Sequence, residues 1–186
     1  MIKAIIFDCF GVLTSDKWKE FVRSLPEAEQ EPARELNRAM DRGFLSPEDF
    51  VKQMHELTGL TSEQIMNAIN PEQDKNISLL NYIRELRPKY KIGLLSNVSS
   101  NWIEESFLTT DEAKLFDALI LSYEVGMIKP DVDLYKLAAR RLSVNPEECI
   151  FIDDGPRNVE GAITAGMQGI HYEGVHRLRA AIEKFS

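Results

Sequence analysis

The fold is decided near the N-terminus by the stretch Lys3-Ala-Ile-Ile-Phe-Asp8-Cys-Phe-Gly11-Val-Leu-Thr14. A continuous apolar run, residues 4–7, stops at the carboxylate of Asp8, and a glycine follows at position 11. Such a run is typical of a short strand that is buried on both faces of a parallel sheet. Ligands of open α/β sheets bind at the carboxyl ends of the strands, so the pattern predicts that Asp8 lies at a ligand site. Taken alone, an aspartate in this position is more simply explained as a cap for the next turn.

The composition predicts one globular core domain with room for an insertion. The chain has 186 residues, of which 44% are apolar and 28% are charged. A net charge of −8 argues against a nucleic-acid or anionic-membrane surface, but a small anionic substrate stays possible at a site that holds a cation. The sequence shows no apolar run of membrane-spanning length and no signal region at its start, so we expect a cytoplasmic protein without nucleic-acid or membrane partners.

Two cysteines, Cys9 and Cys149, both lie inside apolar, strand-like runs. A secreted disulfide framework needs more cysteines than this, so we expect both thiols to be reduced and buried. Neighbouring side chains of a strand point to opposite faces, which turns Cys9 away from Asp8. The pattern therefore favours Cys9 as a core residue over Cys9 as a nucleophile.

Residues 15–75 carry helical patterns only and predict an inserted cap of about four helices. A capping serine followed by proline, a glycine stop and a capping box are signals that begin and end helices. We expect a proline in the first turn of the second helix. The first helix is indicated by Trp18, Phe21, Val22 and Leu25 at helical spacing, and the second by Pro32 at the start of a helix reaching about Met40. The third helix begins at Ser46-Pro47 and ends at Gly59. The fourth begins with Thr61 and Gln64 and runs through Ile69, and the chain breaks at Asn70-Pro71.

From residue 77 onward, helices and strands alternate. Strands are expected at 91–96, 116–121, 149–153 and 169–172, and helices at 79–86, about 100–108, 132–142, 158–165 and from about 177. This alternation predicts a Rossmann-like α/β fold, a parallel sheet with right-handed crossovers and helices on both faces. We therefore expect an α/β core domain formed by residues 1–14 and 76–186, with the helical cap, residues 15–75, inserted after the first strand.

Polar residues follow three of the expected strands, at the edge where a parallel sheet binds its ligands. They are Asp8, the pair Ser96-Asn97 and the pair Asp153-Asp154, while Lys129 precedes a later helix. Ser96-Asn97 also suits a simple turn, and Lys129 also suits a solvated surface position.

The adjacent carboxylates of Asp153 and Asp154 are harder to explain without a ligand. Two neighbouring carboxylates repel each other and need donors or a cation to stay ionised. Mg²⁺, which binds one or two protein carboxylates together with water and phosphate oxygens, meets that need. Asn158 follows Asp154 by one helical turn and is expected to point at the same place.

Phosphoryl transfer to a carboxylate uses all of these groups. Asp8 would attack phosphorus in line and form an aspartyl-phosphate, which water then hydrolyses. Mg²⁺ would neutralise the phosphate charge. Ser96, the amide of Asn97 and Lys129 would hold the phosphoryl oxygens, and the cap would close over the site.

Four motifs carry a resemblance to a known family: residues 8–14 (Asp-Cys-Phe-Gly-Val-Leu-Thr), residues 95–97 (Leu-Ser-Asn), residues 126–131 (Gly-Met-Ile-Lys-Pro-Asp), and residues 151–162, which begin Phe-Ile-Asp-Asp-Gly-Pro-Arg-Asn. Their kind and order resemble the haloacid dehalogenase-like (HAD) hydrolase superfamily, in the group with a small helical cap after the first strand. Within it, the chain looks most similar to bacterial sugar-phosphate phosphatases and the phosphatase domain of soluble epoxide hydrolases. This resemblance covers the chain from end to end.

The resemblance implies roles for individual residues. Asp8 would be the nucleophile and a metal ligand, Ser96 would bind phosphate, and Lys129 would bridge Asp8 and the phosphate. Asp154 would bind the metal, with Asp153 beside it as a further ligand or in support. The implied substrate is a small phosphorylated metabolite.

Phe10 departs from the family pattern. Phosphatases of this superfamily usually carry a second aspartate there, which protonates the leaving oxygen. A phenylalanine cannot donate a proton, and losing a general acid costs roughly 10²–10⁴ in rate. The main-chain carbonyl of Phe10 can still bind Mg²⁺.

Three alternatives follow from this departure. Haloacid dehalogenases proper have an aromatic residue at this position, but they work without a metal and lack paired aspartates such as Asp153-Asp154. A phosphonate-cleaving enzyme would need a cap lysine, for which Lys17, Lys19 and Lys52 are available, although each suits a surface position. The third alternative is a non-catalytic protein that binds a phosphorylated ligand.

Overall fold

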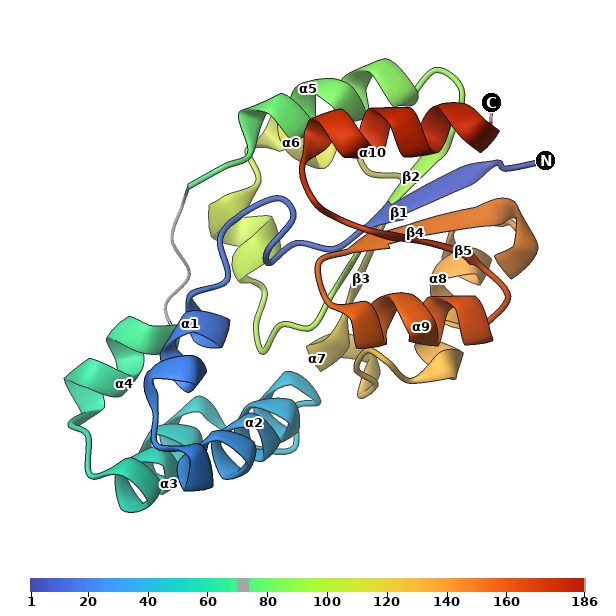
Figure 1. The fold of residues 1–186 in the computed structure, drawn as a ribbon. Coiled ribbons are helices and arrows are strands. Elements are labelled where there is room, and N and C mark those ends of the chain that lie inside the picture. The colour runs from blue at the N-terminus through green and yellow to red at the C-terminus, as the bar shows by residue number, and fades with distance from the viewer. Residues whose placement is uncertain (70–73, 186) are drawn as a thin grey trace.

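A computed structural model describes residues 1–69 and 74–185 of the chain. The predicted break at Asn70-Pro71 lies outside these residues. The five strands of the sheet are all parallel and follow the order β3-β2-β1-β4-β5, which confirms the predicted α/β fold (Figure 1). The strands are β1 (Ala4–Phe7), β2 (Lys91–Ser96), β3 (Ala118–Leu121), β4 (Cys149–Asp153) and β5 (Gln168–His171).

Helices cover both faces of this sheet and form a three-layer core (Figure 1). One face is covered by α5 (Ile77–Leu86) and α10 (Val175–Ile182). The other is covered by α8 (Val132–Arg141) and α9 (Pro156–Thr164). Parallel strands need such crossover helices, and helices on both faces explain why β1 is apolar at every position.

The side chains of β1 alternate between the two apolar layers. Ile5 and Phe7 pack toward α5 and α10, whereas Ala4 and Ile6 pack toward α8 and α9. Cys9 belongs to the layer of Phe7 and is fully buried, and Cys149 is buried too, so both thiols are core groups as predicted. Burial raises the pKa of the Cys9 thiol, which is a poor setting for a nucleophilic thiolate.

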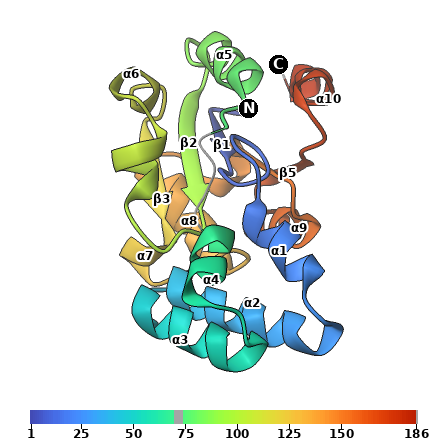
Figure 2. The same ribbon diagram turned by 90° about the vertical axis from the view of Figure 1, so that its left-hand side faces the viewer.

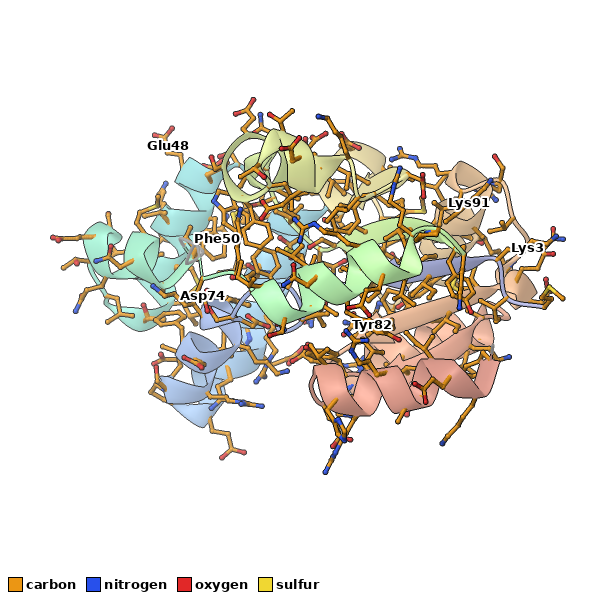
Figure 3. All side chains as sticks on the ribbon, turned by 90° about the horizontal axis from the view of Figure 1, so that it is seen from above. Lys3, Glu48, Phe50, Asp74, Tyr82 and Lys91 are labelled. Atoms are coloured by element: carbon orange, nitrogen blue, oxygen red, sulfur yellow. The ribbon has the colours of Figure 1, made fainter. Side chains whose placement is uncertain are left out.

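Four helices between β1 and α5 pack around an apolar cluster of their own, and we call them the helical cap. They are α1 (Lys17–Ser24), α2 (Glu27–Asp41), α3 (Pro47–Thr58) and α4 (Ser62–Ile69). Phe50 is fully buried in this cluster, while Glu48 on the same helix points outward (Figure 3). Lys3 and Lys91 lie at the far end of the sheet (Figure 3), so the cap faces the carboxyl ends of the strands.

Most helix boundaries in the cap agree with the local signals. The Ser46 hydroxyl accepts the amide of Asp49, Pro47 opens α3, and Gly59 ends it with a positive φ of 70°. Thr61 and Gln64 form the expected reciprocal hydrogen bonds at the start of α4.

The prediction for Pro32 was wrong. Helix α2 begins at Glu27, so this proline lies inside the helix instead of its first turn. Proline removes one helical hydrogen bond at such a position. The burial of Ala33 and Met40 against the cap cluster offsets this cost.

Several short elements have no counterpart in the sequence patterns. The expected helix at about 100–108 is a five-residue π-helix, Ile103–Phe107, and α6 (Thr110–Ala113) and α7 (Ser122–Val125) were not predicted. Two 3₁₀ turns complete the structure, Pro146–Glu148 and Glu183–Phe185. Figure 2 shows the cap helices below the end of the sheet. Within the described ranges, no helix combines the length and the apolar composition that a bilayer crossing requires.

Candidate active site

Three neighbouring strands bring their polar ends together. Asp8 follows β1, Ser96 ends β2, and Asp153 ends β4, and these strands are adjacent in the sheet. Asp8, Asp153 and Asp154 each have a carboxylate oxygen within 4.8 Å of the others. The predicted convergence of the strand ends is therefore present in the structure.

Lys129 is buried between two of these carboxylates. Its Nζ lies 2.6 Å from Asp8 Oδ1 and 2.7 Å from Asp153 Oδ2, and only 4% of the residue is exposed. The side chain of Asn97 fixes its backbone, because Oδ1 accepts the Lys129 amide at 2.8 Å and Nδ2 donates to the Lys129 carbonyl at 3.3 Å. Lys129 is thus a group of the site and not a solvated lysine.

Charge and burial oppose each other in this triad. Burial raises the pKa of Asp8, and the nearby Asp153 raises it further, against the lowering effect of the Lys129 ammonium. Burial also acts to raise the pKa of Asp153, but Lys129 outweighs it and holds that pKa below its usual value. Burial lowers the pKa of Lys129, but the charges of Asp153 and Asp8 outweigh it and keep the ammonium protonated.

Asn158 points at the acidic cluster and binds Asp153 there. Its Nδ2 donates to both oxygens of Asp153, at 3.0 and 3.1 Å, and the amide of Gly155 donates to Asp153 Oδ1 at 2.7 Å. Asn158 stands in the first turn of α9, directly above the strand end that carries Asp153. Both oxygens of Asp153 are therefore engaged by protein donors.

Asp154 contacts the cap and the loop after β1. Lys19 of α1 places its Nζ 2.5 Å from Asp154 Oδ2. Gly11 has a φ of 81°, and a Cβ built at Gly11 would lie 2.5 Å from the carboxyl carbon of Asp154. Only a glycine therefore lets the loop approach this carboxylate so closely.

The Ser96 hydroxyl has no partner. Ser96 is fully buried, and its Oγ makes no hydrogen bond to any described residue. A buried hydroxyl without a partner is rare and indicates a place for a ligand or water. This setting suits the predicted contact between Ser96 and a phosphoryl oxygen.

Phe10 is held by stacking. Its ring lies parallel to that of Trp102, with centroids 5.8 Å apart, and Trp102 stacks in turn on Phe107. The backbone of the same loop folds into a tight turn in which the Cys9 carbonyl accepts the amides of residues 12–14. Phe10 thus forms part of the wall beside Asp8 and offers no proton there.

A cavity of about 600 Å³ opens above these groups, between the core and the cap. Asp8, Lys129, Asn97 and Asp154 lie at its base, and α1 and α2 supply cap walls with residues such as Trp18 and Arg34. Three further lining residues, Asp16, Asp41 and Trp102, were not identified from the sequence patterns. A fourth, Lys19, was interpreted as a surface group. Asp16, Lys19 and Asp41 belong to the cap or lead into it, so their closeness to Asp8 depends on the packing of the cap on the core, which no local sequence pattern predicts. Trp102 belongs to the core and stacks on Phe10.

The oxygen-rich cluster fits a hard divalent cation. Asp8 uses Oδ1 for its contacts with Lys129 and with the Cys9 amide at 2.6 Å, and its carboxylate lies close to those of Asp153 and Asp154. Asp154 likewise engages Lys19 through Oδ2. Carboxylate oxygens at this spacing are the ligands that Mg²⁺ prefers.

Known proteins share both the sequence and the fold. The D-ribitol-5-phosphate phosphatase of Bacteroides thetaiotaomicron is 29% identical over 86% of this chain and 86% of that protein. A HAD-like family hydrolase from Porphyromonas gingivalis has a TM-score of 0.76 at 27% identity, over 100% of this chain and 98% of that one.

A second structure, a HAD family enzyme from B. thetaiotaomicron in complex with magnesium and inorganic phosphate, has a TM-score of 0.70 at 24% identity and covers 93% of this chain and 95% of that one. The family model of haloacid dehalogenase-like hydrolases matches residues 2–166. The chain is a hydrolase of the haloacid dehalogenase-like family.

Proposed function

We propose that the protein is a Mg²⁺-dependent phosphatase that hydrolyses a small phosphate monoester through an aspartyl-phosphate at Asp8. The observation that carries this proposal is the contact of 2.6 Å between Asp8 and Lys129 at the base of the cavity, within the cluster of three aspartates. A carboxylate held by a buried ammonium in this way is oriented for attack on a phosphorus atom placed above it.

Each remaining group of the site has a role in this proposal. Asp8 is the nucleophile, and Lys129 orients it and balances charge on the phosphoryl oxygens. Ser96 donates its hydroxyl to one of those oxygens, since none of the described residues forms a hydrogen bond with it. Asn97 contributes its backbone amide, while its side chain holds Lys129.

The metal would be held by one carboxylate oxygen each of Asp8 and Asp154 and by the main-chain carbonyl of Phe10. When bound, Mg²⁺ supplies charge neutralisation for the phosphate. Asp153 stands beside these ligands, and its engagement by Lys129, Gly155 and Asn158 favours a supporting role that fixes Lys129 over direct coordination.

The proposed substrate is a small phosphorylated metabolite. One relative is a phosphatase of D-ribitol 5-phosphate, so phosphorylated polyols and sugars are the first substrates to test. The cavity has the size of a small-molecule site, and its cap walls would contact the part of the substrate beyond the phosphate.

The first prediction tests this proposal directly. Purified protein with Mg²⁺ should release inorganic phosphate from p-nitrophenyl phosphate and from at least one sugar or polyol phosphate. Asp8→Asn should abolish release, because an amide is not a nucleophile, while its similar size keeps the site packed. A wild-type protein that binds Mg²⁺ in calorimetry and yet hydrolyses no ester in a broad panel contradicts the proposal.

Phe10 gives the second candidate, a dehalogenase, because a halide leaves without protonation. The stack on Trp102 provides a packing reason for the aromatic ring, and the three-aspartate cluster favours the phosphatase. Chloride release from 2-chloropropionate without added metal would establish the dehalogenase. Ligand-induced thermal stabilisation by phosphate esters without turnover would indicate a protein that only binds them.

A further inference from the structure

Hydrolysis of an alkyl phosphate needs a proton that Phe10 cannot supply. The leaving alkoxide is strongly basic, and a positioned general acid contributes roughly 10²–10⁴ in rate. An aryl leaving group is far less basic and needs little help. A phosphatase acting on sugar or polyol phosphates therefore requires another acid near the site.

Geometry fixes the side on which this acid must stand. In an in-line displacement, the attacking and leaving oxygens lie on opposite sides of phosphorus. Asp8 approaches from the end of the sheet, so the leaving oxygen points into the cavity toward the cap. The acid must then come from the cavity wall between core and cap.

Asp16 lies on that wall. It is the residue before α1, it lines the cavity together with Asp8, Lys129 and Asp154, and it is partly buried. Its Oδ1 accepts the backbone amide of Lys19 at 2.9 Å, while the ammonium of the same Lys19 contacts Asp154. The first turn of α1 is thus fixed over the site, with the Asp16 carboxyl at its leading end.

The segment that leads to Asp16 is also fastened. The hydroxyls of Thr14 and Ser15 both donate to Asp74 Oδ1 at 2.9 Å, which joins the segment that leads from the core into the cap to the segment that precedes α5. Asp74 lies where the cap meets the core (Figure 3). A carboxyl on a braced segment can hold the position that proton transfer requires.

We propose that Asp16 is the general acid for the leaving group and replaces the aspartate that is absent at position 10. This proposal rests on the proposed phosphatase function. As Asp8 bonds to phosphorus and the ester bond breaks, the protonated Asp16 carboxyl gives its proton to the leaving oxygen, which departs as an alcohol. The resulting Asp16 carboxylate then takes a proton from the water that attacks the aspartyl-phosphate, which releases phosphate and restores both aspartates.

The surroundings of Asp16 favour its protonated form. Burial raises the pKa of its carboxyl, and the negative charge of Asp154 acts in the same direction. The hydrogen bond from the Lys19 amide and the charges of Lys19 and Lys129 act against it without reversing the shift. Asp41 of α2 is a further charged group that faces Asp16.

Asp41 is the other carboxyl of the cavity wall, and the contacts separate the two. The Asp41 carboxyl accepts a hydrogen bond from Asn37 within α2, and the charged groups that influence it are Lys129 and Asp16. Lys129 also influences Asp16, but Asp16 is in addition influenced by Asp154, and the phosphate is expected between Lys129 and Asp154. Among the described lining residues, no glutamate or histidine offers a further acid.

Asp16 also caps α1, and a test must separate this structural role from proton transfer. Asparagine and serine cap helices about as well as aspartate does, but neither is an acid at neutral pH. Asp16→Asn and Asp16→Ser therefore keep the cap and remove the proton. Asp41→Asn makes the same chemical change elsewhere on the same wall and serves as the matched control.

The experiment measures kcat for an alkyl phosphate, such as a sugar phosphate turned over by the wild type, and for p-nitrophenyl phosphate. Asp16→Asn and Asp16→Ser should lower kcat for the alkyl ester by roughly 10²–10⁴ and for the aryl ester far less. The alkyl-to-aryl ratio should stay at the wild-type value in Asp41→Asn. Circular dichroism and urea unfolding establish that each variant is folded.

Two results would overturn the proposal while leaving the phosphatase intact. One is an unchanged alkyl-to-aryl ratio in both Asp16 variants, which includes an equal loss on both esters and would assign Asp16 a structural role only. The other is a ratio that falls in Asp41→Asn and not in the Asp16 variants. If the wild type hydrolyses no ester at all, the proposed function itself fails, which is a different outcome.

Discussion

At the scale of single residues, the site is organised by one buried ammonium. Lys129 contacts Asp8 and Asp153, and Lys19 contacts Asp154, so two cations stand among three carboxylates. Removing one partner of a buried ion pair typically costs about 3–5 kcal/mol, because the other charge stays buried. Asp8→Asn avoids much of this cost, since Asp153 still balances Lys129, and it is therefore a better probe of chemistry than a change of Lys129.

Ser96 gives a prediction that separates function from stability. Its Oγ is buried without a hydrogen bond, so Ser96→Ala removes an unsatisfied group and should leave the free energy of unfolding unchanged or raise it by about 1 kcal/mol. Phosphate should bind more weakly, because a hydrogen bond to a charged group contributes about 1.5–3 kcal/mol, or roughly ten- to a hundredfold in Kd. Calorimetry with inorganic phosphate and Mg²⁺, together with urea unfolding, measures both effects.

Ser122 provides the control for this prediction. Its Oγ is equally buried, but its single hydrogen lies within hydrogen-bond distance of the carbonyls of Asp41 and Val98, and the oxygen accepts the Val98 amide. Ser122→Ala should therefore destabilise the protein. Equal stability losses in the two variants would contradict the role assigned to Ser96.

Site residues could be predicted from the sequence where they follow directly after a predicted strand. Asp8, Lys129 and Asp154 were expected around one point, and all three line the same cavity, while Ser96 ends the neighbouring strand β2. The partner of Asn158 could not be predicted, because one helical turn places it near both aspartates and only the start of α9 decides for Asp153. Asp16 and Lys19 have the appearance of an ordinary helix start, so their nearness to Asp154 depends on tertiary structure.

At the scale of elements, buried strands and helices with capping residues could be predicted from the sequence. Very short helices, and a helix that contains a proline in its interior, could not. β1, β2 and β4 have the expected bounds because buried parallel strands are apolar throughout. Short helices such as α6 and α7 contain only four residues each and have no periodicity to detect. Helix α2 contains Pro32 in its interior because packing, and not propensity, holds it together.

This proline leads to a prediction for stability. Pro32 is exposed, and its ring removes a hydrogen bond that another residue would donate. Pro32→Ala should therefore stabilise the cap by up to about 3 kcal/mol, less the entropy that alanine adds to the unfolded chain. Urea unfolding followed by circular dichroism measures the change.

Pro47 is the matched control, because it occupies the first turn of α3, where proline is favoured. Pro47→Ala should give no gain in stability. A gain in Pro47→Ala equal to that in Pro32→Ala would show that the effect does not arise from the helix interior.

At the scale of the whole molecule, the cap is fixed to the core where α2 ends. The Asp41 carbonyl accepts the Ser122 hydroxyl at 2.7 Å, and Arg42 pairs with Asp131 at 3.1 Å. The sequence predicted an inserted helical cap, but these contacts join residues about 80–90 positions apart and have no local signature. They fix the wall of the cavity relative to Asp8 and Lys129.

Asp41 makes the stability of this junction depend on pH. Burial raises the pKa of its carboxyl to about 7. The Lys129 charge and the hydrogen bond from Asn37 act to lower this pKa, and the charge of Asp16 acts to raise it. Because the folded state holds this proton more tightly than the unfolded state, the contribution of Asp41 to stability falls as pH rises from the unfolded value of 3.8 and levels off above about 7.

Asp41→Asn cannot ionise, so it should escape this penalty. Relative to the wild type, its free energy of unfolding should rise by about 2 kcal/mol between about pH 5 and about pH 8. Asp111→Asn, a change on an exposed side chain of α6, should follow the wild-type pH profile. Urea unfolding of the three proteins across this range measures the difference. If the free energies of unfolding of Asp41→Asn and the wild type changed with pH in parallel, the Asp41 carboxyl would ionise in the folded protein without cost. Water would then reach it at the junction between cap and core.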